Sequence, residues 1–488
     1  MKELSDIIKD KFSSNTDLST QQFKVGERFG YAFFIPSIVD MKLLSSGVLE
    51  EIKEYGVKKN NGSIEELSAY IKAYNLIIKS GDRQTKDIIN ELLKGAVVII
   101  FDGDNNAIAI PMQGAEKRAI QEPPTSAVVK GPREGFVEDL NTNLGLIRKR
   151  LKTPDFSVIK KVLGKRTNTE IAICYIDGIA DEDIIKEIQD KLDDIEIDAI
   201  LDSYYVQTLL ESKNNTTFKQ IGNTEKPDIA VAKMLEGRIV IVVDGSPIVL
   251  TVPFIFIESL QNADDYYTFP AKASYVRIIR FLGLIIAIAL PGIYVAMQSY
   301  HYKVLPINFL LSLMSSIQGI SFPPILEILF VLFLFEILNE ASIRMPKYLG
   351  MALSIIGALI LGNTAVEAGI ITSPSIVVVA ISGITLYIVP DQANECGLLR
   401  TLFTLAGGVA GFFGIVLCFM ILTTYLADIT SYKAPYLAPY APTITQDKKD
   451  AIFKQDLVDM KNRPLSIKNN DKVRIKNISR RNKNGTDR

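Results

Sequence analysis

The sequence contains no tryptophan, one histidine and three cysteines among its 488 residues. The cysteines, Cys174, Cys396 and Cys418, lie far apart in the chain, so they predict neither a disulfide framework nor a zinc motif. A Ser-His-Asp triad would have to be built on His301, which lies in a predicted loop between two apolar segments. We therefore expect no catalytic site, no metal site and no cofactor.

Charge is scarce in the region that follows about residue 277. Apolar segments at residues 281–297 and 376–389 approach the length of about 20 residues that a bilayer-spanning helix needs, and residues 402–426 carry no charge at all. Helices of soluble proteins rarely have this composition, so the chain is predicted to be an integral membrane protein in a lipid bilayer. Without tryptophan, tyrosines such as Tyr294 and Tyr300 must supply the aromatic belts.

The formal net charge of −1 conceals a basic C-terminus, because residues 468–488 carry eight lysines and arginines against two aspartates. Next to apolar segments, such a tail fits the cytoplasmic side of a membrane better than a nucleic-acid arm, so no nucleic-acid partner is expected. Arg277 and Arg280 precede the first span, and residues 1–12 lack the apolar core of a signal peptide. We expect the N-terminal region to be cytoplasmic.

The polar N-terminal half contains an internal duplication. Residues 32–40 resemble residues 173–181, and residues 95–103 resemble residues 237–245 at almost the same offset. Each copy contains an apolar strand that ends in Asp-Gly, a strong signal for a hairpin turn. Strands alternating with helices predict two α/β subdomains that face each other. They either enclose a ligand-binding cleft or serve as packing modules.

Between the two copies lies a segment rich in proline and glycine, and a helix is predicted after it at residues 136–151. The segment reads Glu-Pro-Pro-Thr at residues 122–125 and Gly-Pro-Arg-Glu-Gly-Phe at residues 131–136. It lacks the glycine spacing of a phosphate-binding loop, so we expect a structural turn rather than an anion site. The residues that define the motif are Glu122, Pro123, Pro124, Gly131, Pro132, Arg133, Glu134 and Gly135.

This segment closely resembles the A-subunit family of bacterial spore germinant receptors. Residues 175–181, 237–253, 344–347 and 365–369 resemble the same family, and the resemblance spans about residues 24–440. One departure is Ile-Pro-Ser at residues 35–37, where many relatives have a run like Tyr-Ile-Asp-Gly.

The resemblance implies a receptor subunit in the spore inner membrane that acts with a B-type membrane subunit and a C-type lipoprotein. It also implies that small nutrients, recognised mainly by the B-type partner, trigger release of monovalent cations. A-type subunits would form a homo-oligomer that conducts ions. Two alternatives stay open: an accessory amplifying germination ion channel of the same family, and a non-conducting scaffold for a sensing partner subunit.

The predicted fold is an α/β two-lobed soluble N-terminal domain followed by an all-α polytopic transmembrane domain. The number of crossings stays open, because residues 304–320 fit an interfacial or re-entrant helix. The predicted divisions are an N-terminal extension (1–23), a first α/β subdomain (24–115), a linker and helix (116–160), a second α/β subdomain (161–270), a transmembrane helical domain (277–430), and a Pro-containing linker with a partly disordered basic cytoplasmic tail (431–488).

Polar side chains inside the apolar segments are candidates for an ion path, because an ionisable group within a bilayer is costly. The candidates are Glu336, Asn339, Glu340, Asn363 and Glu367. Residues four apart share a helix face, so Glu336 and Glu340 could line a cation path together. Alternatively, these groups pair with Arg344, Lys347 or partner subunits. Glu327 lies roughly opposite Glu336 on the same helix and is expected to serve another contact.

Small residues mark a close approach between helices in the last apolar segment. Gly407 and Gly411 have the spacing of a GxxxG step. This step predicts either an oligomer seam or helix packing within one subunit.

Overall fold

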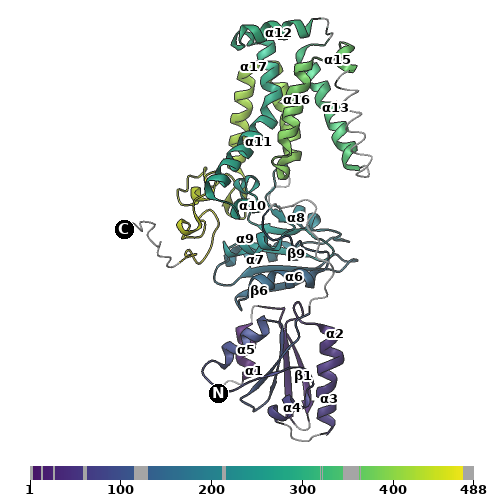
Figure 1. Cartoon of the computed structure of the whole chain (residues 1–488), viewed down its shortest axis with the longest axis vertical. Helices are drawn as coiled ribbons and strands as arrows, with labels where there is room; N and C mark the ends of the chain where they lie inside the picture. Colours follow the sequence, from purple (N-terminus) through teal and green to yellow (C-terminus); the bar gives the residue numbers. More distant parts are fainter. Residues whose placement is uncertain are drawn as a thin grey trace, which may run out of the picture.

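The structure is a computed structural model that describes residues 4–12, 15–25, 28–58, 63–114, 130–211, 216–318, 320, 322–344, 362 and 364–475. Two α/β lobes and a helical domain are stacked along the long axis of the molecule (Figure 1). The predicted fold class is confirmed for the two lobes and for the helical character of the region that follows them.

The first lobe is a five-stranded antiparallel sheet in the order β1-β2-β4-β5-β3. Its strands are β1 (Ser19–Val25), β2 (Arg28–Phe34), β3 (Leu76–Ile78), β4 (Ala96–Phe101) and β5 (Ala107–Pro111). Its helices are α1 (Leu4–Lys11), α2 (Met41–Leu43), α3 (Leu49–Lys58), α4 (Ile64–Tyr70) and α5 (Gln84–Leu93). The strand β4 is buried at every position, which explains its continuous apolar sequence. The helix α1 and most of β1 belong to this lobe, although residues 1–23 were predicted to form an N-terminal extension.

The second lobe repeats the first, with strands in the order β6-β7-β9-β10-β8. Its strands are β6 (Phe156–Leu163), β7 (Thr169–Ile176), β8 (Gly222–Thr224), β9 (Ile239–Val243) and β10 (Val249–Val252). Its helices are α6 (Leu140–Arg150), α7 (Glu182–Asp193), α8 (Ser203–Leu210) and α9 (Pro227–Leu235). The same strand order in both sheets confirms the duplication. Gly103 and Gly245 take positive φ angles of 77° and 86°, as the predicted hairpin turns require.

The lobes contact each other directly through a buried polar junction. The backbone N–H of Thr16 donates to the carbonyl of Val158 on β6 at 2.9 Å. Arg148 on α6 pairs with Asp17 at 2.8 Å, and both side chains are only 1% exposed. Asp17 also accepts a hydrogen bond from Ser37, which lies in the segment that departs from the family pattern. This contact supports the alternative in which the lobes are packing modules.

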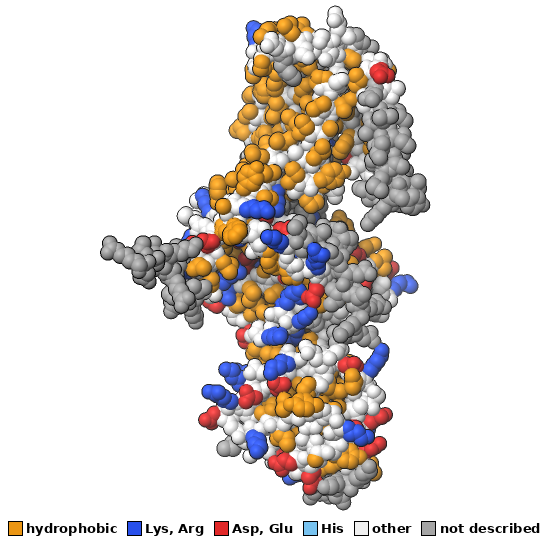
Figure 2. All heavy atoms as spheres, viewed as in Figure 1, with side chains coloured by type: hydrophobic (Ala, Val, Ile, Leu, Met, Phe, Trp, Pro, Cys, Tyr) orange, Lys and Arg blue, Asp and Glu red, His pale blue; other side chains and the backbone are white. Residues whose placement is uncertain are grey.

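The helical domain contains α11 (Pro270–Ser299), α12 (Ile307–Ile317), α13 (Pro324–Arg344), α15 (Ala365–Glu367), α16 (Ser373–Leu386) and α17 (Ala393–Asp428). Of the described helices, α11 and α17 are long and apolar enough to cross a membrane. Figure 2 shows hydrophobic side chains over most of the visible surface of this domain, whereas charged side chains gather on the lobes. The helix α12 lies across the far end of the domain, as expected for an interfacial helix (Figure 1).

The C-terminal segment, residues 429–475, folds back onto the second lobe instead of forming an extended linker and a disordered tail. Tyr436 and Ile467 are fully buried, and the Asn470 N–H donates to the carbonyl of Ile179 at 2.9 Å. Lys468 pairs with Asp181 at 2.8 Å. The prediction of disorder was therefore wrong up to residue 475, because apolar side chains spaced among the charged ones are buried against the lobe. The predicted tail beyond residue 475 lies outside the described residues.

Candidate functional site at the foot of the membrane helices

The Gly-Pro-Arg-Glu-Gly motif lies against α10 (Ala263–Tyr266), the short helix that precedes α11. Gly131 has a φ angle of +122°, and a Cβ at this position would lie 2.7 Å from the ring of Tyr267. A side chain is therefore excluded both by backbone conformation and by space. The backbone N–H of Lys130 donates to the carboxylate of Asp264 at 3.2 Å. The motif thus connects the second lobe to the base of the first membrane helix.

Other residues of the motif make structural contacts of the same kind. The buried Lys226 donates from Nζ to the carbonyl of Pro132 at 2.9 Å. Glu134 accepts from Lys149 at 2.8 Å and from Arg150 at 2.7 Å, and these cations hold the pKa of Glu134 below its ordinary value. Such contacts favour the structural turn over an anion site. Arg133 is exposed and Gly135 is buried, whereas Glu122, Pro123 and Pro124 lie outside the described residues.

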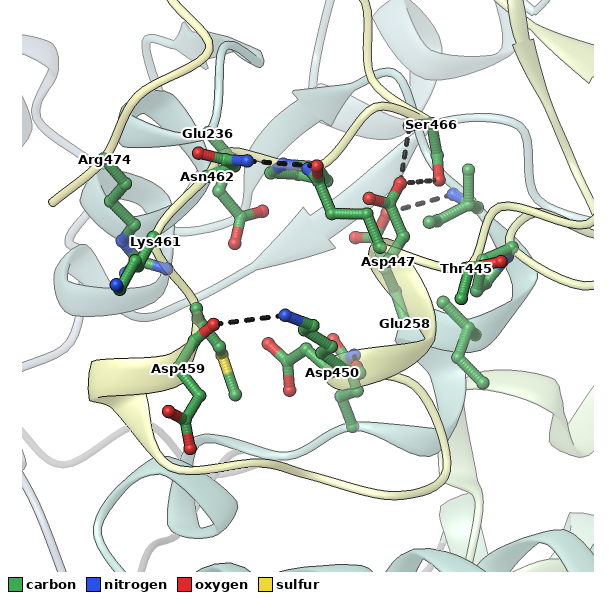
Figure 3. Close-up of a pocket in the computed structure, with 18 of the residues that line it drawn as sticks. Glu236, Glu258, Thr445, Asp447, Asp450, Asp459, Lys461, Asn462, Ser466 and Arg474 are labelled. Carbon is green, nitrogen blue, oxygen red and sulfur yellow. Dashed lines mark hydrogen bonds between the residues drawn. The ribbon is translucent and has the colours of Figure 1, made fainter.

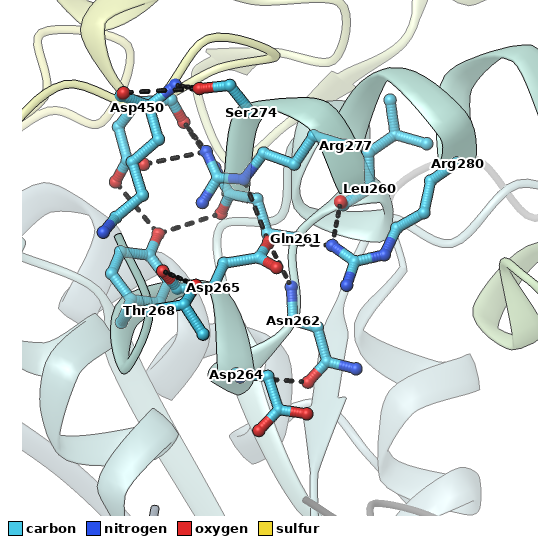
Figure 4. Close-up of polar contacts among 12 residues, drawn as sticks. Leu260, Gln261, Asn262, Asp264, Asp265, Thr268, Ser274, Arg277, Arg280 and Asp450 are labelled. Atoms are coloured by element: carbon cyan, nitrogen blue, oxygen red, sulfur yellow. Dashed lines mark hydrogen bonds and ion pairs between the residues drawn. The ribbon is translucent and has the colours of Figure 1, made fainter. Parts of the chain in front are cut away.

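A buried ion-pair cluster holds the foot of α11 (Figure 4). Arg277 is 0% exposed, and its Nε donates to Asp265 at 2.9 Å. Its Nη1 donates to the carboxylate of Asp450 at 2.9 Å and to the carbonyl of Ala451 at 2.6 Å. Arg280 donates to the same oxygen of Asp265 at 2.8 Å. One arginine therefore joins α10, α11 and the C-terminal segment.

The two arginines were interpreted from sequence as signals of membrane orientation. In the structure, both are also partners of buried carboxylates, so they have a structural role. The sequence could not reveal this role, because Asp450 follows Arg277 by more than a hundred residues. Replacing such a pair by a single uncompensated charge is strongly unfavourable in a protein interior.

A cavity of about 390 Å³ lies between the second lobe and the C-terminal segment. Figure 3 shows carboxylates from both sides at its wall, among them Glu236, Glu258 and Asp450. Arg238 pairs with Glu236 at 2.6 Å and with Glu258 at 2.9 Å. Burial raises the pKa of Glu236. Asp450 belongs to both the cavity wall and the Arg277 cluster, so the two features form one continuous junction.

The helical domain contains a buried arginine that the sequence analysis did not single out. Arg400 on α17 is only 1% exposed, and it pairs with Glu336 on α13. Its other guanidinium nitrogen lies 3.4 Å from the hydroxyl of Ser382 on α16. The position of Arg400 beside the charge-free residues 402–426 was the available signal, because an isolated charge at the edge of an apolar helix needs a partner.

The remaining candidates for the ion path are not gathered at one place. Glu340 pairs with Arg344 on the exposed surface of α13, which is one of the partners expected from sequence. Asn339 accepts a hydrogen bond from Tyr387 at 2.8 Å. Glu367 lies in α15, close to α12 at the far end of the domain (Figure 1). Asn363 lies outside the described residues.

The glycine step in α17 packs within the chain. A Cβ on Gly407 would lie 2.3 Å from the carbonyl oxygen of Gly292 on α11. Gly411 has a positive φ of 59° at a kink in α17 and lies against His301. These contacts support helix packing within one subunit for both residues.

Comparison with known proteins finds one family that matches most of the chain. Residues 6–466 match the model of a family described as "Bacillus/Clostridium GerA spore germination protein". Spore germination protein KA of Bacillus subtilis (strain 168) is 35% identical over 96% of this chain and 86% of its own length. Spore germination protein GerLA of Bacillus cereus is 30% identical over 95% of each chain. The crystal structure of the N-terminal domain of the A subunit of the Bacillus megaterium spore germinant receptor GerK3 aligns with 52% of this chain and 94% of that chain, with 30% identity and a TM-score of 0.40.

Proposed function

Because this chain belongs to the GerA family of spore germination proteins, we propose that it is the A-type membrane subunit of a nutrient-germinant receptor. It resides in the spore inner membrane with its two lobes in the cytoplasm. It acts with a B-type membrane subunit and a C-type lipoprotein, and it couples the sensing of a nutrient to cation release. No enzymatic step is part of this function.

The observation that carries the coupling is the buried Arg277 at the foot of α11. Its contacts join the helix to α10 and to the C-terminal segment, which in turn packs on the second lobe. A displacement of the lobe therefore acts on the first membrane helix through short, buried contacts instead of a flexible linker. The motif at Gly131 adds a second connection at the same level.

Cation conduction by a homo-oligomer is supported by the exposed polar face of α13. Glu336 and Glu340 have side chains that are 48% and 60% exposed, although the surrounding surface is apolar. Carboxylates in a membrane domain avoid lipid and face protein or a water-filled path. We therefore propose that neighbouring copies place this face of α13 toward an ion path, to which Asn339, Asn363 and Glu367 contribute.

The test is cation release from spores that carry Glu336→Ala in the chromosomal gene. We expect slower release of monovalent cations after nutrient addition, because the variant removes the charge that faces the path. The comparison is made at matched protein abundance, since the variant also leaves the buried Arg400 without its carboxylate partner. Glu50→Ala, on the exposed surface of α3, is the matched control and should release cations as the wild type does. Wild-type release from a Glu336→Ala protein at normal abundance would contradict the assignment.

A further inference from the structure

The helical domain contains a buried carboxylate, Glu327, that no cation accompanies among the described residues. Glu327, in the first turn of α13, is only 1% exposed. Its Oε1 accepts hydrogen bonds from the backbone N–H of Thr372 at 2.6 Å and from the Thr372 hydroxyl at 2.8 Å. Both donors are neutral, and the described ion pairs of this domain do not include Glu327. An uncompensated buried carboxylate costs several kcal/mol.

One hydroxyl group contacts this carboxylate, and two more lie close to that hydroxyl. The hydroxyls of Thr372 and Ser375, at the start of α16, are 2.8 Å apart, and both residues are buried. Tyr294 on α11 lies beside Thr372, Ser375 and Glu327. Its side chain is only 8% exposed, and its hydroxyl lies close enough to interact with Thr372 and Ser375 but forms no hydrogen bond of standard geometry with a described residue. Buried hydroxyls normally form such bonds, so this oxygen keeps capacity to coordinate a ligand.

Glu327 and the three hydroxyl groups lie in apolar surroundings that exclude bulk water. Tyr294, Ile328, Ile371 and Val379 belong to one hydrophobic cluster formed by α11, α13 and α16. In such surroundings the negative charge is compensated most directly by a positive charge bound between the oxygens. Oxygen ligands suit hard cations, and one carboxylate with neutral hydroxyls matches a single positive charge.

We propose that Glu327, Thr372, Ser375 and Tyr294 form a binding site for one monovalent alkali cation. A cavity of about 510 Å³ at the far end of the domain is lined by Thr372 and also by Ser316, Gln318, Glu367 and Ser373. Thr372 therefore belongs both to the cavity wall and to the contacts of Glu327, and Glu367 gives the cavity a negative wall. The site deepens the proposed function, on which its role in cation release rests, but binding itself can be measured without germination.

The experiment uses the purified full-length protein in lipid nanodiscs and measures thermal unfolding in NaCl, KCl and N-methylglucamine chloride at equal ionic strength. We expect an alkali ion to raise the Tm saturably, by about 3 °C or more at concentrations far above its dissociation constant. Equilibrium binding of radioactive thallium(I) or sodium should saturate at about one ion per chain, as the single carboxylate site predicts.

Two variants make the test specific. Glu327→Gln keeps an oxygen that accepts from Thr372 but removes the charge, so it should abolish both the Tm rise and saturable ion binding. Glu50→Gln, on the exposed surface of α3 in the first lobe, is the control and should retain both. A wild-type protein that shows no alkali-dependent rise, or a Glu327→Gln protein that binds the ion as the wild type does, would overturn the proposal. Binding in vitro together with normal germination of Glu327→Gln spores would leave the site in place and contradict its role in cation release.

Discussion

At the scale of single residues, ion pairs of buried arginines join the separate parts of this molecule. Arg148 with Asp17 joins the two lobes, Arg277 with Asp265 and Asp450 joins α11 to α10 and to the C-terminal segment, and Arg400 with Glu336 joins helices of the membrane domain. Each arginine is almost completely buried. Because a buried charge without its partner is strongly unfavourable, each pair fixes the relative position of two elements.

The first prediction concerns Arg277. Arg277→Met should lower the free energy of unfolding by about 3 kcal/mol, because it leaves the half-buried Asp450 without its arginine and the buried Asp265 with Arg280 alone. Thermal unfolding of the purified protein measures the change. Lys272→Met, at an exposed position of the same helix, should change stability by less than about 0.5 kcal/mol. An Arg277→Met protein as stable as the control would show that the cluster does not hold the helix.

The second prediction concerns pH and Glu134. Lys149 and Arg150 lower the pKa of Glu134 in the folded protein, so the folded state binds its proton less tightly than the unfolded state. The ion pairs of Glu134 therefore stabilise the folded state at pH values above the ordinary pKa of a glutamate. This stabilisation is lost as the pH falls through the pKa of Glu134 in the folded protein. Glu134→Gln should reduce Tm near pH 7. Below about pH 5 its Tm should fall less steeply with decreasing pH than the Tm of the wild type does. Glu138→Gln, which is exposed, should keep the wild-type profile; identical profiles for both variants would contradict the assignment.

At the scale of elements, two long helices form the centre of the membrane domain. The helices α11 and α17 approach at Gly292 and Gly407, where each glycine lies against the backbone of the other helix. Close backbone approach at small residues is typical of membrane helices, since lipid provides little hydrophobic drive for association. Tyr300 adds a hydrogen bond to the carbonyl of Val409 at 2.9 Å.

The third prediction tests this approach. Gly407→Val should destabilise the helical domain by about 1–3 kcal/mol, because its Cβ would overlap the carbonyl oxygen of Gly292. Gly397→Ala on the same helix is the control, since its Cβ would meet its nearest atom at an ordinary 3.5 Å. The unfolding midpoint of both proteins in one detergent gives the comparison. Equal midpoints would indicate that α11 and α17 separate without cost.

The sequence was sufficient to predict those strands and turns that have a local pattern of residues. Asp-Gly turns after apolar strands located both hairpins, and the two copies were recognisable because each keeps the same strand, turn and offset. Sequence did not locate pairs between distant residues, such as Arg400 with Glu336, since spacing along one helix says nothing about the facing helix. The packing of the C-terminal segment on the second lobe was not predicted for a related reason. Its many charged residues indicated disorder, and its few apolar residues, which are buried in the structure, showed no regular pattern in the sequence.

At the scale of the whole molecule, the two lobes and the helical domain form a stack in which each layer is joined to the next by buried contacts. The first lobe contacts β6 at one edge of the second sheet, and the membrane helices and the C-terminal segment contact the second lobe at its other end (Figure 1). A force that acts on the lobes therefore reaches α11 without a flexible break at the Arg277 cluster. This arrangement suits a subunit that relays a signal to a membrane pathway.

The most direct measurement deletes the gene and follows germination of the spores against a panel of single nutrients. The account predicts that the response to one class of nutrient is lost while the others are kept, and that the wild-type gene restores the lost response. A uniform slowing with every nutrient would instead indicate the accessory amplifying channel, and unchanged responses to all nutrients would contradict a role as a receptor subunit.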